Sequence, residues 1–328
     1  GKWHAGGNPK NQGFDVSTDS RSMKTLTDRA VNFMEQNKDN PFFLYFSPHS
    51  VHIPLEGPSD LVAKYQKKKT TPGRINHPVY AAVIEELDRC VGRMLDGLEK
   101  AGVSDNTMVV FYSDNGGMYR NYLDGGEPVT NNGRLRGEKG TLYEGGIRVP
   151  LIIRWPGHAR AGAVCSEPVT SPDFYPTILA AVGAGRPSGH TLDGKSLAPL
   201  LRNPNADLSR DAIYWHYPYY HHSRPAGAIR SGEWKLIEFF DDRSLELYNL
   251  EEDIGEQKDL DSEHHEKALE LQKELAVWRK RVDAGMPTPN PRYDPKRAGE
   301  WWSRRTGKPL DPVELNKRWR TRWPVCDQ

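Results

Sequence analysis

The chain has 328 residues, a formal net charge of +1 and 36% hydrophobic residues. This length suits one large domain with a smaller one, and the near-zero charge gives no general attraction to nucleic acid or membranes. No run of about 18 apolar residues occurs, so we expect no membrane span. Three scattered cysteines, Cys90, Cys165 and Cys326, exclude a disulfide framework or a cysteine-based zinc site.

The first part of the chain alternates predicted helices and strands. Apolar spacing predicts a helix over residues 26–37, capped by Thr27, and a second helix over residues 79–100. The aromatic run 42–46 and the apolar run 107–112 predict core strands, the second of them buried in a parallel sheet. This alternation predicts an α/β fold with a doubly wound, mostly parallel sheet.

The glycine-rich stretch 116–147 predicts a long functional loop. A strand over residues 148–155 and a helix over 171–182 follow, and the Gly, Pro and Asn content of 183–211 marks a boundary. Four short antiparallel strands and a covering helix then predict a smaller α+β subdomain. We place these strands at 212–217, 226–231, 234–239 and 245–248 and the helix at 262–283.

The predicted organisation therefore has three parts. An α/β domain covers residues 1–205, an antiparallel-sheet subdomain covers 206–285, and a tail covers 286–328. The chain contains no internal repeat that would suggest an array of smaller units.

Asp114 and Asn115 stand where the strand predicted at 107–112 ends and a Gly-Gly turn begins. In open α/β sheets, ligands bind outside the carboxyl ends of the strands. Two hard oxygen donors at that edge predict part of a Ca²⁺ or Mg²⁺ site. An ordinary Asx turn, with Gly116 at positive φ, is the alternative explanation of the same residues.

Two histidines and two lysines could complete an anion site. His49 and His52 lie in a loop after the strand predicted at 42–46, where a histidine can bind an oxyanion or protonate a leaving oxygen. Lys139 lies near glycines that permit close approach to a ligand, and Lys2 and His4 share one face of an extended segment. Solvated surface side chains are the alternative for each. Together they suit a tetrahedral oxyanion ester.

Four segments occur in an order that resembles the type I, formylglycine-dependent sulfatases of the alkaline phosphatase superfamily. They are Gly-Lys-Trp-His at 1–4, Pro-Phe-Phe-Leu-Tyr-Phe-Ser-Pro-His-Ser-Val-His-Ile-Pro at 41–54, Ser-Asp-Asn-Gly-Gly at 113–117 and Gly-Glu-Lys-Gly-Thr-Leu-Tyr-Glu-Gly-Gly-Ile-Arg-Val-Pro at 137–150. Residues 216–218, 228–236 and 247–250 resemble that family's C-terminal subdomain. The resemblance covers about residues 1–285 and implies the alkaline phosphatase-like fold.

The resemblance implies a metal and two anion-binding lysines. Asp114 and Asn115 resemble two of the family's four Ca²⁺ ligands. Lys2 and Lys139 resemble the lysines that hold the sulfate group. The implied cofactors are Ca²⁺, with Mg²⁺ as the other candidate, and a formylglycine residue. The implied partner is a sulfated small molecule or glycan, with no nucleic acid.

The resemblance also gives roles to histidines. His4 resembles the histidine that bonds the formylglycine hydrate, and His52 resembles the one that contacts sulfate and the leaving oxygen as a general acid. His49 is expected to be structural. Glu144 and Arg148 are expected to brace their loop rather than react.

One departure from the family is large. The nucleophile arises from a Cys/Ser-x-Pro-x-Arg motif, which this chain lacks, and the paired aspartates that complete the metal site are also missing. Both lie upstream of Gly-Lys-Trp-His in the family. We therefore expect a C-terminal portion of a sulfatase, inactive and poorly soluble alone, from a periplasmic or secreted parent. The sequence leaves the oligomeric state open.

Two other functions remain open. The first is a phosphate or phosphonate monoester hydrolase of the same superfamily, which would share the oxygen-rich metal edge. The second is a non-catalytic pseudoenzyme or glycan-binding module.

The tail at 286–328 adds a separate question. It holds ten Lys or Arg against five Asp or Glu, with tryptophans at 301, 302, 319 and 323. Either its tryptophans pack it onto the surface, or it contacts a polyanionic sulfated glycan through charge and ring stacking.

Overall fold

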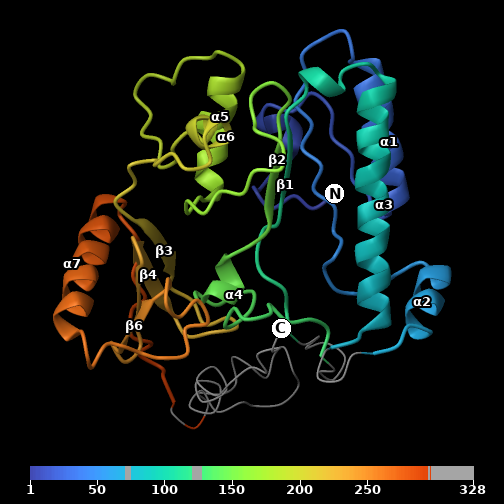
Figure 1. Ribbon diagram of the computed structural model, residues 1–328. Coiled ribbons are helices and arrows are strands. Elements are labelled where there is room, and N and C mark those ends of the chain that lie inside the picture. Colours follow the sequence, from blue (N-terminus) through green and yellow to red (C-terminus); the bar gives the residue numbers. More distant parts are fainter. Residues whose placement is uncertain (71–74, 120–127, 295, 297–328) are drawn as a thin grey trace. The chain divides into compact units, whose positions relative to one another are not determined.

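The computed structural model describes residues 1–70, 75–119, 128–294 and 296 (Figure 1). The chain divides into two compact units, residues 1–109 with 128–130, and residues 110–127 with 131–328. The domain boundary expected near residue 205 stays a prediction. The tryptophans of the tail lie outside the described residues.

The first unit is built from helices. They are η1 (Pro9–Gln12), α1 (Met23–Gln36), α2 (Ser59–Gln66), α3 (Pro78–Lys100) and η2 (Ser104–Asn106). The long helix α3 packs against both α1 and α2. Its Gly97 lies against Met34 and Val31 of α1, which lets the two helix backbones come close. The helix predicted over 79–100 is thus confirmed. No helix in the described ranges is long and apolar enough to cross a bilayer.

The start of α1 differs from the prediction. Ser22 is the N-cap, because its Oγ accepts a hydrogen bond from the Thr25 N–H at 3.2 Å. Thr27 lies fully buried inside the helix, where its hydroxyl donates to the Met23 carbonyl at 2.8 Å. The expected cap was wrong because the first apolar residue of the buried face is Met23 rather than Leu26.

Residues 42–46 do not form the predicted core strand. Among the described residues this segment has no partner ladder, and beside it only one backbone bond joins Lys2 N–H to the Ser47 carbonyl, at 2.6 Å. Phe43 and Tyr45, two residues apart, are both exposed. An apolar run becomes a strand only where another strand satisfies its backbone groups.

The second unit begins with a strand pair, β1 (Val109–Tyr112) and β2 (Leu151–Arg154). Because Ser113 N–H bonds the Pro150 carbonyl, the end of β1 lies beside the start of β2, and the strands run in opposite directions. The burial predicted for the first strand is wrong. Val110, Phe111 and Tyr112 are 36–39% exposed, since this strand has a single neighbour among the described residues. Among the described residues, no strand runs parallel to β1.

The rest of the second unit follows the prediction closely. Short helices come first, and then a four-stranded antiparallel sheet in the order β3-β4-β5-β6 with a final helix. Their bounds are α4 (Glu144–Ile147), η3 (Ser171–Asp173), α5 (Phe174–Ala181), α6 (Ala198–Arg202), β3 (Ile213–Tyr217), β4 (Ala226–Ser231), β5 (Trp234–Phe239), β6 (Leu245–Asn249) and α7 (His265–Arg281).

Both faces of this sheet are covered. On one face Ile229, Leu236 and Leu247 pack against the buried leucines of α7. On the other face Ala228, Ile237 and Tyr248 form a second core with Leu142 and Tyr143. The glycine-rich stretch predicted to be a long functional loop is therefore anchored on the C-terminal sheet at Leu142 and Tyr143.

Candidate functional site

The predicted metal ligands lie in the turn that follows β1. Asp114 is exposed, and the Asn115 amide donates to the Gly116 carbonyl at 3.1 Å. Gly116 does not adopt positive φ, in contrast to the Asx-turn alternative. It is glycine because a Cβ there would lie 1.7 Å from the Gly145 carbonyl oxygen. The turn is thus pressed directly against the segment that begins α4.

Lys139 stands in a turn that requires glycine on both sides. Gly137 and Gly140 have φ of 78° and 84°, in the left-handed region that disfavours other residues. A Cβ on Gly140 would lie 2.7 Å from His221 and 2.9 Å from His222 in the β3–β4 connection. These glycines therefore admit close packing by the protein itself, in addition to any approach by a ligand.

Two side chains that the sequence did not reveal connect these turns. Asn132 donates to the carbonyls of Gly117 and Gly137, at 3.0 Å each, and accepts from the Gly117 N–H at 2.9 Å. Glu138 is fully buried and accepts from the Tyr119 N–H at 2.6 Å. The sequence shows only that an asparagine and a glutamate occur in a polar loop. Both residue types are common in loops, so nothing singled these two out.

Glu138 has a second buried partner. The Nδ1 of His222 lies 3.4 Å from its Oε1, and both side chains are almost fully buried. Glu138, which precedes Lys139, is therefore held both by the segment that follows β1 and by the β3–β4 connection. The sequence gives no hint of this contact because the two residues lie far apart in the chain.

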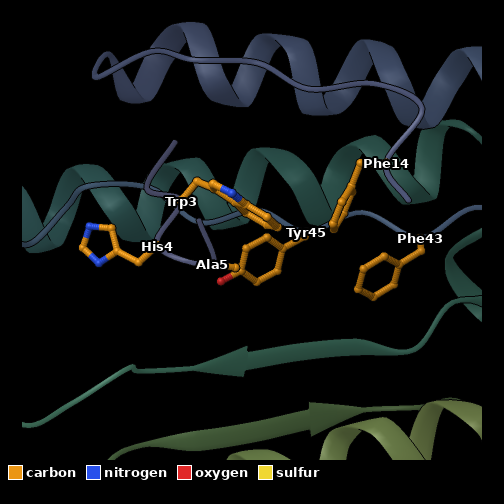
Figure 2. Close-up of a pocket in the computed structure, with 6 residues that line it drawn as sticks. All are labelled: Trp3, His4, Ala5, Phe14, Phe43 and Tyr45. Atoms are coloured by element: carbon orange, nitrogen blue, oxygen red, sulfur yellow. The ribbon is translucent and has the colours of Figure 1, made fainter. Parts of the chain in front are cut away.

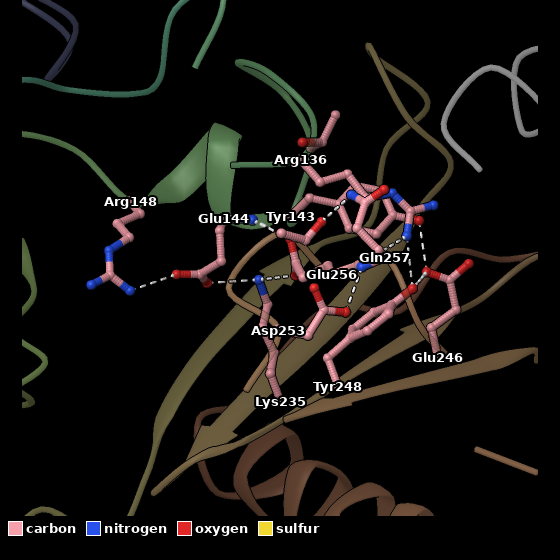
Figure 3. A network of polar contacts seen from close by, with 12 residues as sticks. Arg136, Tyr143, Glu144, Arg148, Lys235, Glu246, Tyr248, Asp253, Glu256 and Gln257 are labelled. Atoms are coloured by element: carbon pink, nitrogen blue, oxygen red, sulfur yellow. Dashed lines mark hydrogen bonds and ion pairs between the residues drawn. The ribbon is translucent and has the colours of Figure 1, made fainter. Parts of the chain in front are cut away.

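Glu144 links its loop to the C-terminal sheet and also contacts Arg148; that neither residue reacts stays a prediction. Glu144 Oε2 accepts from Arg148 at 3.3 Å, and its Oε1 lies 2.9 Å from Lys235 Nζ (Figure 3). Lys235 also contacts Glu256 Oε1 at 2.7 Å, and the Glu144 N–H donates to Glu256 Oε2 at 2.7 Å. These residues join α4 to β5 and to the turn after β6.

Burial sets the charge balance of this cluster. Burial raises the pKa of Glu256 to about 7, although Lys235 opposes the shift. Burial also acts to raise the pKa of Glu144, but Lys235, together with Arg230 and Arg148, outweighs it and leaves that pKa below its ordinary value. Near neutral pH the buried Lys235 is thus paired with one carboxylate and with a second that is half protonated.

An arginine and two tyrosines extend the network. The hydroxyls of Tyr143 and Tyr248 both donate to Glu246 Oε2 at 2.7 Å, and Arg136 donates to Tyr248 at 2.9 Å (Figure 3). Burial raises the pKa of both tyrosines well above the usual range, so they stay protonated donors. This hydrogen-bonded network therefore supports the turn at residues 137–140 that carries Lys139, called here the lysine turn.

The remaining predicted residues lie in the first unit. Lys2 is tied through its backbone to Ser47, whose hydroxyl donates to the Lys2 carbonyl at 2.7 Å. His52 is exposed, and its Nδ1 lies 2.7 Å from the Ile53 carbonyl. His49 Nδ1 is buried with no hydrogen-bond partner among the described residues, and burial, then Arg21, lowers its pKa.

His4 lies at an aromatic hollow of about 440 Å³ (Figure 2). Trp3, Phe14 and Tyr45 form its wall, with ring centroids 5.6–6.5 Å apart. These three rings, with Phe43, present an apolar surface beside the imidazole. Trp3 therefore anchors the segment that carries Lys2 and His4, while His4 itself is exposed.

The donor set at Asp114 and Asn115 fits a hard divalent cation in kind but not in number. Ca²⁺ takes six to eight oxygen ligands. In the described part of the chain, no group of three or more His, Cys, Asp or Glu side chains could hold a metal ion. Among the described residues, the predicted ligand set is therefore limited to the side chains of Asp114 and Asn115.

Comparison with known proteins identifies two family models that match this chain and several related proteins. Residues 3–184 match the family model described as Sulfatase, and residues 137–281 match the one described as N-sulphoglucosamine sulphohydrolase, C-terminal. A sulfatase of Formosa agariphila is 38% identical over 279 residues, 77% of this chain and 49% of that protein. Human arylsulfatase D is 34% identical over 224 residues, 66% of this chain and 35% of that protein.

Solved structures show the same fold. The crystal structure of Ps i-CgsB has a TM-score of 0.69 and 30% identity, over 81% of this chain and 56% of that chain. The crystal structure of its complex with k-i-k-neocarrahexaose has a TM-score of 0.70 and 29% identity, over 94% of this chain and 64% of that chain. The predicted α/β fold with an antiparallel C-terminal sheet is confirmed. The chain spans about half of the length of the Formosa agariphila sulfatase and about a third of that of human arylsulfatase D.

Proposed function

This chain belongs to the sulfatase family, and we propose that the protein hydrolyses sulfate monoesters. The observation that carries the proposal is the hydrogen-bonded link between the turn of Asp114 and Asn115 and the turn of Lys139. A hard-metal donor pair and a cationic side chain held in one rigid unit suit a tetrahedral oxyanion. The relatives named sulfatase and arylsulfatase support the same reaction.

Lys139 is proposed to bind a sulfate oxygen, since its ammonium group can offset negative charge that grows on the ester oxygens. Members of the family use a formylglycine nucleophile and a divalent metal. We propose Ca²⁺ as the metal, held in part by Asp114 and Asn115, where it would add positive charge beside the sulfate. Lys2 is proposed as the second sulfate-binding lysine.

His52 is proposed as the general acid. Its Nδ1 is within hydrogen-bond distance of the Ile53 carbonyl, so that nitrogen carries a proton that it donates there. The Nε2 proton is then the one that passes to the leaving oxygen when the sulfur–oxygen bond breaks. His4 is proposed to hydrogen-bond the nucleophile and to accept its proton when the enzyme is regenerated.

The substrate is proposed to be a sulfated glycan. Support comes from Ps i-CgsB, which was solved in complex with k-i-k-neocarrahexaose and resembles 94% of this chain. The reaction would cleave a sulfate monoester on such a sugar chain and leave the hydroxyl group.

The test measures how fast the complete gene product turns over matched aryl sulfate and aryl phosphate esters. It also measures turnover of k-i-k-neocarrahexaose. We expect sulfate ester turnover, lowered about 10²–10³-fold in kcat by Lys139→Ala, as for loss of one oxyanion-binding group. Lys273→Ala, on the exposed face of α7, is the matched control and should leave turnover unchanged. Preferential phosphate ester turnover, or glycan binding without turnover, would contradict the proposal.

A further inference from the structure

Asn132 uses its whole amide group on two backbone turns. Its Nδ2 donates to the Gly117 carbonyl and to the Gly137 carbonyl, at 3.0 Å each. Its Oδ1 accepts from the Gly117 N–H at 2.9 Å. Gly117 comes two residues after Asn115, and Gly137 comes two residues before Lys139. One side chain thus spans the predicted metal ligands and the predicted sulfate-binding lysine.

A second contact supports the same connection. Glu138 precedes Lys139 directly, and its buried carboxylate accepts from the Tyr119 N–H at 2.6 Å. The Gly116 N–H also donates to the Gly146 carbonyl at 3.0 Å. The two turns are therefore held in one relative position by hydrogen bonds from both sides.

We propose that Asn132 is a positioning residue that sets where Lys139 stands relative to Asp114 and Asn115. This inference rests on the proposed function, because it assumes that these three residues bind one sulfate–metal pair. The Asn132 amide bonds backbone groups of the two turns. It acts by fixing the separation of the two turns, so that the metal ligands and the lysine meet the same anion without rearrangement.

This role differs from a purely structural one. Asn132 is only half-buried, and among the described residues its side chain hydrogen-bonds backbone atoms of the two turns and belongs to neither core of the sheet. Replacing Asn132 by alanine should therefore let the two turns move relative to each other, while the sheet and its two cores stay packed. The loss should appear in anion binding more than in thermal stability.

The experiment uses Asn132→Ala in the complete gene product, with Asn203→Ala as the matched control. Asn203 also accepts a backbone N–H, from Asn205 at 3.1 Å, but it lies at the end of α6. Calorimetry gives the dissociation constants for Ca²⁺ and for inorganic sulfate, and thermal unfolding gives Tm. Because three neutral hydrogen bonds are lost, we expect sulfate binding to weaken about tenfold in N132A. N203A should bind both ions as the wild type does.

A double-mutant cycle with Lys139→Ala tests the mechanism. If Asn132 acts through Lys139, N132A should weaken sulfate binding much less when Lys139 is already absent. Equal effects in both backgrounds, or a lower Tm with unchanged dissociation constants, would overturn the inference. A wild-type protein that binds Ca²⁺ and sulfate but hydrolyses no ester would refute the proposed function and leave this test intact.

Discussion

Replacing Lys235 by methionine removes the cation between two buried carboxylates. Lys235 is fully buried, and its Nζ lies 2.9 Å from Glu144 and 2.7 Å from Glu256. Loss of one partner of a buried ion pair costs about 3–5 kcal/mol, because the other charge is left without compensation. We expect K235M to lower the free energy of unfolding by this amount at pH 8.

The cost should depend on pH in a defined direction. The folded-state pKa of Glu256 is about 7, against an ordinary value of 4.5, so the native protein holds a proton that the unfolded chain has lost. Stability therefore falls as pH rises between these two values, by up to about 1.4 kcal/mol per pH unit. Without Lys235 this pKa rises further, and the fall continues above pH 7. The cost of K235M should be larger at pH 8 than at pH 6, by up to about 1.4 kcal/mol.

Urea unfolding followed by tryptophan fluorescence at pH 6 and pH 8 measures this difference, since Trp215 and Trp234 lie in the affected sheet. Lys273→Met is the control, because that lysine is exposed on α7. The reasoning fails if K235M is no more destabilising than K273M at pH 8, or if its cost is greater at pH 6.

Three further substitutions test the packing and the local geometry. Leu271→Ala, at a fully buried position on α7, should cost about 2–5 kcal/mol in urea unfolding, whereas Leu269→Ala, 47% exposed on the same helix, should cost under about 0.5 kcal/mol. Gly140→Ala should destabilise more than Gly162→Ala in thermal unfolding, because both have positive φ but only the first meets neighbouring atoms; equal losses would leave strain in φ as the sole cause. Ser22→Ala should cost about 1 kcal/mol by removing the α1 cap, and an unchanged unfolding midpoint would contradict that assignment.

Local patterns predicted the elements whose partners are close in sequence. The strands of the β3–β6 sheet and the helix α3 fall within a few residues of their predicted bounds, because alternation, helical spacing and turn residues act locally. The segment 42–46 failed for the opposite reason. Its aromatic residues favour a strand, but a strand also needs a neighbour, and no local pattern supplies one.

The site divides in the same way. Motif order indicated Asp114, Asn115 and Lys139, whose roles stay predictions. Asn132 and Glu138 escaped notice because their importance lies in what they bond, across 15 to 19 residues of chain. A polar side chain in a loop has many possible partners, and only the folded backbone selects among them.

The two-sided packing of the β3–β6 sheet bears on how such proteins can be recombined. Leu142 and Tyr143 belong to the same core as one face of the sheet. When segments are swapped between related proteins, the lysine turn and the C-terminal strands should therefore be transferred together. A chimera joined just before Gly137 would transfer this core intact, and the family model that starts at that residue has the same limit. A chimera joined at 205/206 would pair a loop from one parent with a sheet from another. Inheritance of the lysine turn and of the C-terminal sheet is then expected to be linked.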